Sequence, residues 1–72
     1  MKKVFKMQEL DCANCAAKME EAIRKIPGVE HASMNFMTQK LTLEAAEADF
    51  GRVLDEAQKA ISRIEKDCLI IR

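Results

Sequence analysis

Two cysteines separated by two residues, Cys12 and Cys15, are the side chains of this sequence with the clearest capacity for chemistry. Their spacing lets both sulfurs converge on one metal ion across a tight loop. A helical apolar periodicity begins at Ala16, so both cysteines stand at a helix start, where free backbone N–H groups and the helix dipole stabilise thiolates. Because the thiolate is the form that binds metal, this position favours metal ligation over an inert pair of buried thiols.

Thiol–disulfide exchange is the main rival interpretation, since a Cys-x-x-Cys at a helix start is also typical of thioredoxin-like proteins. That fold needs more chain than 72 residues, the single proline, Pro27, follows the predicted helix, and no aromatic residue flanks Cys12. A four-cysteine structural zinc site is excluded because the chain has only three cysteines. The cysteine pair therefore predicts an open metal-binding loop.

The elements that position this loop follow the order β-α-β-β-α-β. Alternation of apolar and polar residues predicts strands over 5–8, 29–36, 41–43 and 68–71. Apolar stripes at spacings of three and four predict helices over 16–26 and 50–64, with Asp49 as N-cap of the second. Packing both helices on one face of a four-stranded antiparallel sheet buries the two stripes together. The sequence thus predicts an α+β, ferredoxin-like βαββαβ fold in one domain, residues 1–72.

In this fold the start of the last strand lies beside the end of the first strand. Glu65, Asp67 and Cys68 therefore come towards the cysteine loop. For Glu65 and Asp67 the default expectation is solvated loop charge, and for Cys68 a core position on the face of Ile70. Any part that these three residues take in metal binding is left open by the sequence.

The loop segment LDCANCAAK, residues 10–18, resembles the metal loop of heavy-metal-associated (HMA) domains, and the resemblance continues through IPGV at 26–29 and NFMTQKLTL at 35–43. Such modules occur as copper chaperones, as mercury carriers and at the amino end of P-type metal-transporting ATPases. The resemblance implies that Cys12 and Cys15 bind metal. An aspartate directly before the first cysteine is typical of zinc-, cadmium- and lead-exporting ATPases, which implies Asp11 as a third ligand. The family's Gly-Tyr or Gly-Phe pair near the end of helix two is replaced here by Glu65-Lys66.

The charge of the ligand set also favours a divalent ion. Two thiolates and one carboxylate leave Zn²⁺, Cd²⁺ or Pb²⁺ with a net charge of minus one, whereas Cu⁺ would leave minus two. Zinc accepts carboxylate oxygen and prefers about four ligands, while copper(I) is satisfied by two soft sulfurs. Copper(I) remains the alternative, and Lys66 supports it because a lysine in this region offsets the negative site of some copper chaperones. An N-cap for helix one is the alternative role of Asp11.

The leading hypothesis is a non-enzymatic module that delivers metal within, or regulates, a metal-exporting P-type ATPase. Its partners are then the metal ion and the remaining domains of the membrane ATPase, or a metal-delivering protein; a free-standing copper(I) chaperone is the alternative. Twelve basic and twelve acidic side chains, with no Trp or Tyr, argue against a nucleic-acid partner. No run approaches the ~20 apolar residues that span a bilayer, so we expect a cytoplasmic chain without direct membrane insertion.

Overall fold

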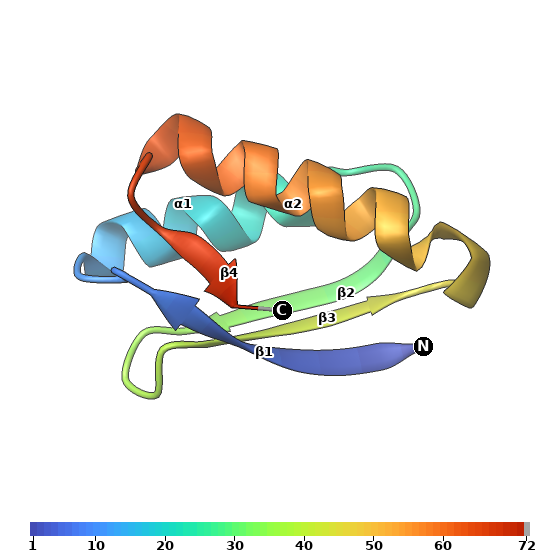
Figure 1. The fold of residues 1–72 in the computed structure, drawn as a ribbon, viewed down its shortest axis with the longest axis horizontal. Helices are drawn as coiled ribbons and strands as arrows, with labels where there is room; N and C mark the ends of the chain where they lie inside the picture. Colours follow the sequence, from blue (N-terminus) through green and yellow to red (C-terminus); the bar gives the residue numbers. More distant parts are fainter. Residues whose placement is uncertain (72) are drawn as a thin grey trace.

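The structure is a computed structural model that describes residues 1–71. Four strands form one antiparallel sheet in the order β2-β3-β1-β4, and both helices cover the same face of it (Figure 1). The predicted ferredoxin-like α+β fold is therefore confirmed. The elements along the chain are β1 (Lys2–Gln8), α1 (Ala13–Arg24), β2 (Val29–Asn35), β3 (Lys40–Ala45), the 3₁₀ turn η1 (Glu47–Asp49), α2 (Phe50–Ile64) and β4 (Leu69–Ile71).

The core lies between the helices and the covered face of the sheet. Because side chains alternate between the two faces of a strand, one register places all the apolar inner positions of β1 and β3 in this layer. The two helical stripes close the core from the other side, and none of its members is more than 8% exposed. The largest fully buried side chains are Leu10, Met19, Ile23, Leu41, Leu43, Ile61, Val53 and Cys68.

The turn between α1 and β2 requires its glycine. Gly28 has φ +98°, in the left-handed region that residues with a side chain rarely adopt. A Cβ at this position would stand 2.8 Å from Nη2 of Arg52, which donates a hydrogen bond to the carbonyl of Pro27. Pro27 follows the first helix as expected, but the helix ends at Arg24, so Ile26, predicted as its last residue, lies beyond it.

The two helix starts differ from the sequence-based expectations. α1 begins at Ala13, and its N-cap is Cys12, so the alternative role of Asp11 as N-cap is wrong. Asp49 does precede α2, but its side chain makes no capping hydrogen bond. The reason is that η1 runs directly into α2 and leaves Asp49 in a helical conformation, with φ −98° and ψ −6°.

Three connections meet at one end of the sheet. Gln8 at the end of β1 pairs with Leu69 at the start of β4, as the antiparallel arrangement predicts. The turn between β2 and β3 reaches the same end, where the Gln39 carbonyl accepts a hydrogen bond from the Met7 amide at 2.8 Å. The cysteine loop between β1 and α1 is therefore flanked by the β2–β3 turn and by the α2–β4 connection (Figure 1). No helix within residues 1–71 is long and apolar enough to cross a membrane.

Candidate metal centre

The cysteine loop is anchored on both sides by buried residues. Glu9 turns the chain out of β1 with φ +61°, and Leu10, only 1% exposed, fixes the start of the loop in the core. The Leu10 carbonyl accepts a hydrogen bond from Nε2 of Gln39 at 3.2 Å. Ala16, also buried, fixes the first turn of α1, and its amide donates to the Cys12 carbonyl at 2.9 Å. Residues 11–15 are therefore held between two anchored ends.

The two thiols lie close together at the N-terminus of α1. Sγ of Cys12 accepts a hydrogen bond from the Cys15 amide at 3.3 Å, which makes this thiol the capping group of the helix. Cys12 is exposed and Cys15 is half-buried. The pKa of Cys12 is lowered mainly by a hydrogen bond between the two side chains and, to a smaller extent, by the hydrogen bond from the Cys15 backbone N–H. The same side-chain hydrogen bond raises the pKa of Cys15. The pair is therefore arranged for one thiolate to form before the other.

Asp11 lies in the same pocket as the two cysteines. This shallow pocket of about 120 Å³ is lined by all three residues predicted as metal ligands. Within residues 1–71, however, no three His, Cys, Asp or Glu side chains are arranged to hold one metal ion. The structure therefore brings Asp11, Cys12 and Cys15 to one pocket without preassembling a three-ligand geometry. Their role as ligands stays a prediction.

Further carboxylates form the walls of this pocket. Glu65, at the C-terminus of α2, and Asp67 line it from the α2–β4 connection, and Glu9 lines it from the end of β1. All three are exposed, as expected for solvated charges, but together with Asp11 they surround the thiols with negative charge. Sequence reasoning missed Glu9. Its place two residues before Asp11, at the predicted end of a strand, was the signal available.

Cys68 takes no place in the pocket lining. It is fully buried in the core, which confirms the expected core position, and burial raises the pKa of its thiol. Its carbonyl accepts a hydrogen bond from Nε2 of Gln58, whose Oε1 accepts the Ile70 amide. Gln58 thereby fixes the start of β4, and Cys68 contributes packing at this position.

Methionine and histidine are further potential metal ligands, and those of this chain lie in the core or away from the thiols. Met7, Met19 and Met34 are buried, and Met37 is 87% exposed at the β2–β3 turn, so the methionines do not form a surface cluster. Met19 is nevertheless part of the pocket lining beneath the cysteines. His31 is exposed on β2 and pairs with Glu44 of β3.

Comparison with known protein families identifies the family to which the chain belongs. The sequence profile of the heavy-metal-associated (HMA) domain matches residues 4–67 of the chain. The chain belongs to the HMA domain family. The match includes β1 from Val4 onward, the cysteine loop, both helices, β2 and β3, so the family resemblance noted from the loop extends over most of the fold.

Curated relatives of this HMA domain are metal-transporting ATPases. It is 47% identical to a cadmium-transporting ATPase of Staphylococcus aureus over 38 residues, which are 53% of the chain and 5% of that protein. It is 38% identical over 56 residues to a zinc/cadmium/lead-transporting P-type ATPase of Escherichia coli, covering 78% of the chain and 8% of the relative. A copper-transporting ATPase of Rhizobium meliloti is 41% identical over 39 residues, 54% of the chain and 5% of that protein. The chain thus matches less than a tenth of each of these transporters.

Solved structures give the same fold. The chain resembles a CopZ metallochaperone with a TM-score of 0.75 at 15% identity, over 99% of this chain and 100% of that one. At this identity the likeness establishes the ferredoxin-like fold and carries no information on the metal.

Proposed function

We propose that this HMA domain binds one Zn²⁺, Cd²⁺ or Pb²⁺ ion through Asp11, Cys12 and Cys15. The observation that carries the proposal is the pocket in which an exposed thiol with a lowered pKa stands beside a second thiol and a carboxylate. Thiolates suit soft and borderline ions, and a carboxylate oxygen suits the divalent members of that group. No bond is made or broken in the cargo, so the function is binding and release.

The charge around the loop supports a divalent cargo. Two thiolates and Asp11 leave a divalent ion at minus one, and Glu9, Glu65 and Asp67 add further negative charge at the pocket wall. A monovalent ion would leave more of this charge uncompensated in a partly desolvated loop. The acidic wall is therefore better matched to Zn²⁺, Cd²⁺ or Pb²⁺ than to Cu⁺.

The proposed setting is the cytosolic face of a membrane, where the domain delivers metal within, or regulates, a metal-exporting P-type ATPase. The curated relatives named above support this setting because they are transporters that contain a matching segment. A three-ligand shell suits delivery, since zinc prefers about four ligands and a partner's ligand can enter before the original ones leave. The rest of the transporter, or a metal-delivering protein, is then the exchange partner.

A copper(I) chaperone is the second candidate function. It is favoured by the copper-transporting relative and by Lys66, an exposed cation between Glu65 and Asp67. This function requires only the two sulfurs, so it predicts that copper(I) affinity does not depend on Asp11.

The test is the Zn²⁺ affinity of the fully reduced chain, measured by competition with a chromophoric chelator. We expect one equivalent per chain and a loss of about tenfold or more in Asp11→Ala, the scale on which even outer-shell partners act. Glu47→Ala is the matched control, because it removes one exposed acidic charge from η1, away from the loop. If zinc bound equally strongly to wild type and Asp11→Ala, the copper(I) chaperone would become the favoured function.

A further inference from the structure

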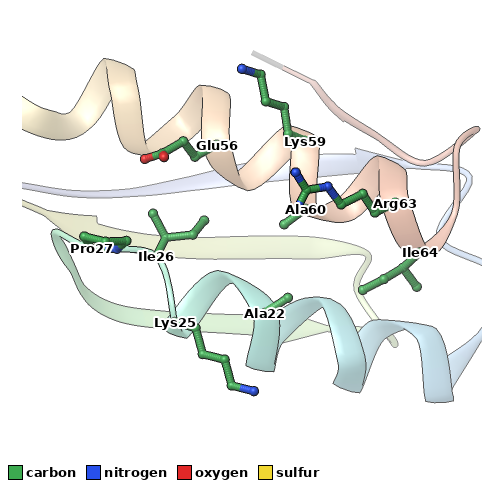
Figure 2. Close-up of a pocket in the computed structure, with 9 residues that line it drawn as sticks. All are labelled: Ala22, Lys25, Ile26, Pro27, Glu56, Lys59, Ala60, Arg63 and Ile64. Carbon is green, nitrogen blue, oxygen red and sulfur yellow. The ribbon is translucent and has the colours of Figure 1, made fainter.

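A second cavity, distinct from the metal pocket, lies between the two helices. It is a groove of about 570 Å³ whose lining comes from the C-terminal half of α1, the turn after it, and the second half of α2 (Figure 2). Ala22 of α1 and Ala60 of α2 have short side chains, so the helices leave a hollow between them at this level. Ile26 and Ile64, both half-buried, form the apolar ends of the hollow. Ligand grooves of about 300–1,000 Å³ are the common size in proteins.

The rim of this groove carries an excess of positive charge. Lys25 directly follows α1, and Lys59 and Arg63 stand on α2 (Figure 2). The acidic residue of the lining, Glu56, is engaged in an ion pair with Arg52. Lys25 approaches Glu21 at 3.7 Å, but both side chains are more than 70% exposed, and such pairs contribute little. The groove is therefore apolar at its base and basic on both sides.

Lys59 and Arg63 also repel each other. They are four residues apart on one helix, a spacing that brings side chains together and makes like charges unfavourable. Neither residue takes part in an ion pair within residues 1–71. An anionic group placed over this part of the groove would relieve the repulsion and form two new charge pairs.

We propose that the α1–α2 groove is a docking site for an acidic polypeptide segment that also carries apolar side chains, such as an amphipathic helix with Glu or Asp beside its apolar stripe. An apolar helix face laid into a hydrophobic groove is a recurring recognition mode, and acidic flanks match the cations on both rims. The concave shape favours a peptide over a bilayer. The apolar side chains of a peptide can enter a hollow, whereas the flat surface of a bilayer cannot. A second copy of this chain fits the groove poorly. Its exposed acidic cluster lines the metal pocket, which is itself concave, so this cluster cannot enter the groove of another copy.

This site is separate from the metal pocket but adjoins it. Ile64 closes one end of the groove, and the next residue, Glu65, lines the metal pocket. The acidic pocket repels the segment that the basic groove attracts, so the bound segment is held on the helices and the thiols stay open to metal exchange.

The experiment uses the full chain, reduced and metal-free, and a fluorescent synthetic peptide of roughly 14 residues with Leu at helical spacing and Glu on the flanks. A second peptide has Gln in place of every Glu. Binding is followed by anisotropy and located by amide chemical shifts. We expect saturable binding of the Glu peptide alone, with shifts at Ala22, Ala60 and Ile64, and affinity that falls as salt is raised.

Two variants and one control decide the assignment. Lys59→Glu/Arg63→Glu should weaken binding about tenfold, as expected when two exposed charge pairs are reversed. Ala60→Leu should weaken it by filling the hollow without a change in charge. Lys2→Glu/Lys3→Glu is the matched control, because it makes the same change in net charge at exposed positions of β1 and should leave affinity unchanged.

Several results would overturn the proposal. They are equal binding of the Glu and Gln peptides, equal loss in the β1 control, or no saturation up to about 1 mM peptide, the limit of weak specific affinity. Flotation with phosphatidylserine vesicles without peptide binding would assign the groove to a membrane, and salt-dependent dimerisation at the groove would assign it to a second copy. A Cys12→Ser/Cys15→Ser variant should bind the peptide normally, so failure of metal binding and failure of docking are distinguished.

Discussion

The two helices of this domain begin in different ways, although an aspartate stands near both starts in the sequence. α1 begins at an exposed thiol: Cys12, extended at φ −127°, accepts the Cys15 amide on its sulfur. α2 begins inside the fold, where η1 runs into Phe50, which is only 6% exposed and donates its amide to the Glu47 carbonyl. An extended residue that enters a helix from solvent leaves the first amides available to an anion such as a thiolate, and α1 has this feature while α2 does not.

The largest effect is expected for Cys12→Ala, which removes the capping sulfur at the start of α1. We expect Zn²⁺ affinity to fall at least about 100-fold, because a thiolate ligand is lost together with the hydrogen bond that orders Cys15. The free energy of unfolding should fall by up to about 1 kcal/mol, because the variant also loses the N-cap of α1. Chelator competition and urea unfolding measure the two effects.

Cys68→Ala is the matched control for that experiment. It removes the fully buried thiol, so it should lower the free energy of unfolding by about 1–2 kcal/mol and leave the zinc affinity of the folded domain unchanged. Retention of wild-type zinc affinity in Cys12→Ala would remove the α1 start from the binding site.

The corresponding change at the other helix start is Phe50→Ala. Its ring lies in the core against the ring of Phe5, with centroids 6.2 Å apart, so truncation should lower the free energy of unfolding by about 3 kcal/mol. Under conditions where the variant is folded, zinc affinity should equal that of wild type. Phe50→Leu, which keeps most of the volume, should cost about 1 kcal/mol. A selective loss of zinc affinity in a folded Phe50→Ala domain would contradict the separation of the two helix starts.

The sequence was a good guide wherever one local signal decided the outcome. Apolar periodicity located both helices and the covered face of the sheet, and spacing alone brought Cys12 and Cys15 together. It failed where two local signals competed. Asp11 and Cys12 both precede α1, and the backbone path that buries Leu10 makes Cys12 the cap. The acidic wall was predicted in part: Glu65 and Asp67 were expected near the loop from the antiparallel pairing of the first and last strands, and both line the pocket. Glu9 was missed because its place in the wall depends on the left-handed turn at φ +61°, for which its residue type gives no signal.

The thiols of the α1 start should also titrate in order. The pKa of Cys12 is lowered by the Cys15 side chain and then by the Cys15 backbone N–H, and the pKa of Cys15 is raised by the same side-chain bond. As pH rises, iodoacetamide should therefore modify Cys12 before Cys15, as followed by mass spectrometry of the native domain. In Cys15→Ala the pKa of Cys12 should move up towards the ordinary thiol value, because the larger of the two hydrogen bonds is gone.

These two shifts act on folding with opposite signs. The lowered pKa of Cys12 favours the folded state above the ordinary thiol pKa, and this contribution is lost as pH falls through the folded pKa. The raised pKa of Cys15 disfavours the folded state as pH rises past its ordinary value. Alkylation of each residue is therefore the suitable measurement, and simultaneous modification of both thiols at every pH would contradict the asymmetric hydrogen bond.

The smallest expected effect is at Asp49, and it tests whether α2 lacks a capping side chain. Loss of a true N-cap costs about 1 kcal/mol, whereas Asp49→Ala should change the free energy of unfolding by less than about 0.5 kcal/mol. Its own amide already donates to the Ala46 carbonyl, and η1 continues the backbone hydrogen bonding into α2, so the side chain has no amide to cap. Asp49→Asn serves as the control that keeps the capping capacity. A loss of about 1 kcal/mol in Asp49→Ala that is absent in Asp49→Asn would mean that both helices are capped by side chains, and only the identity of the capping atom would then distinguish the metal loop.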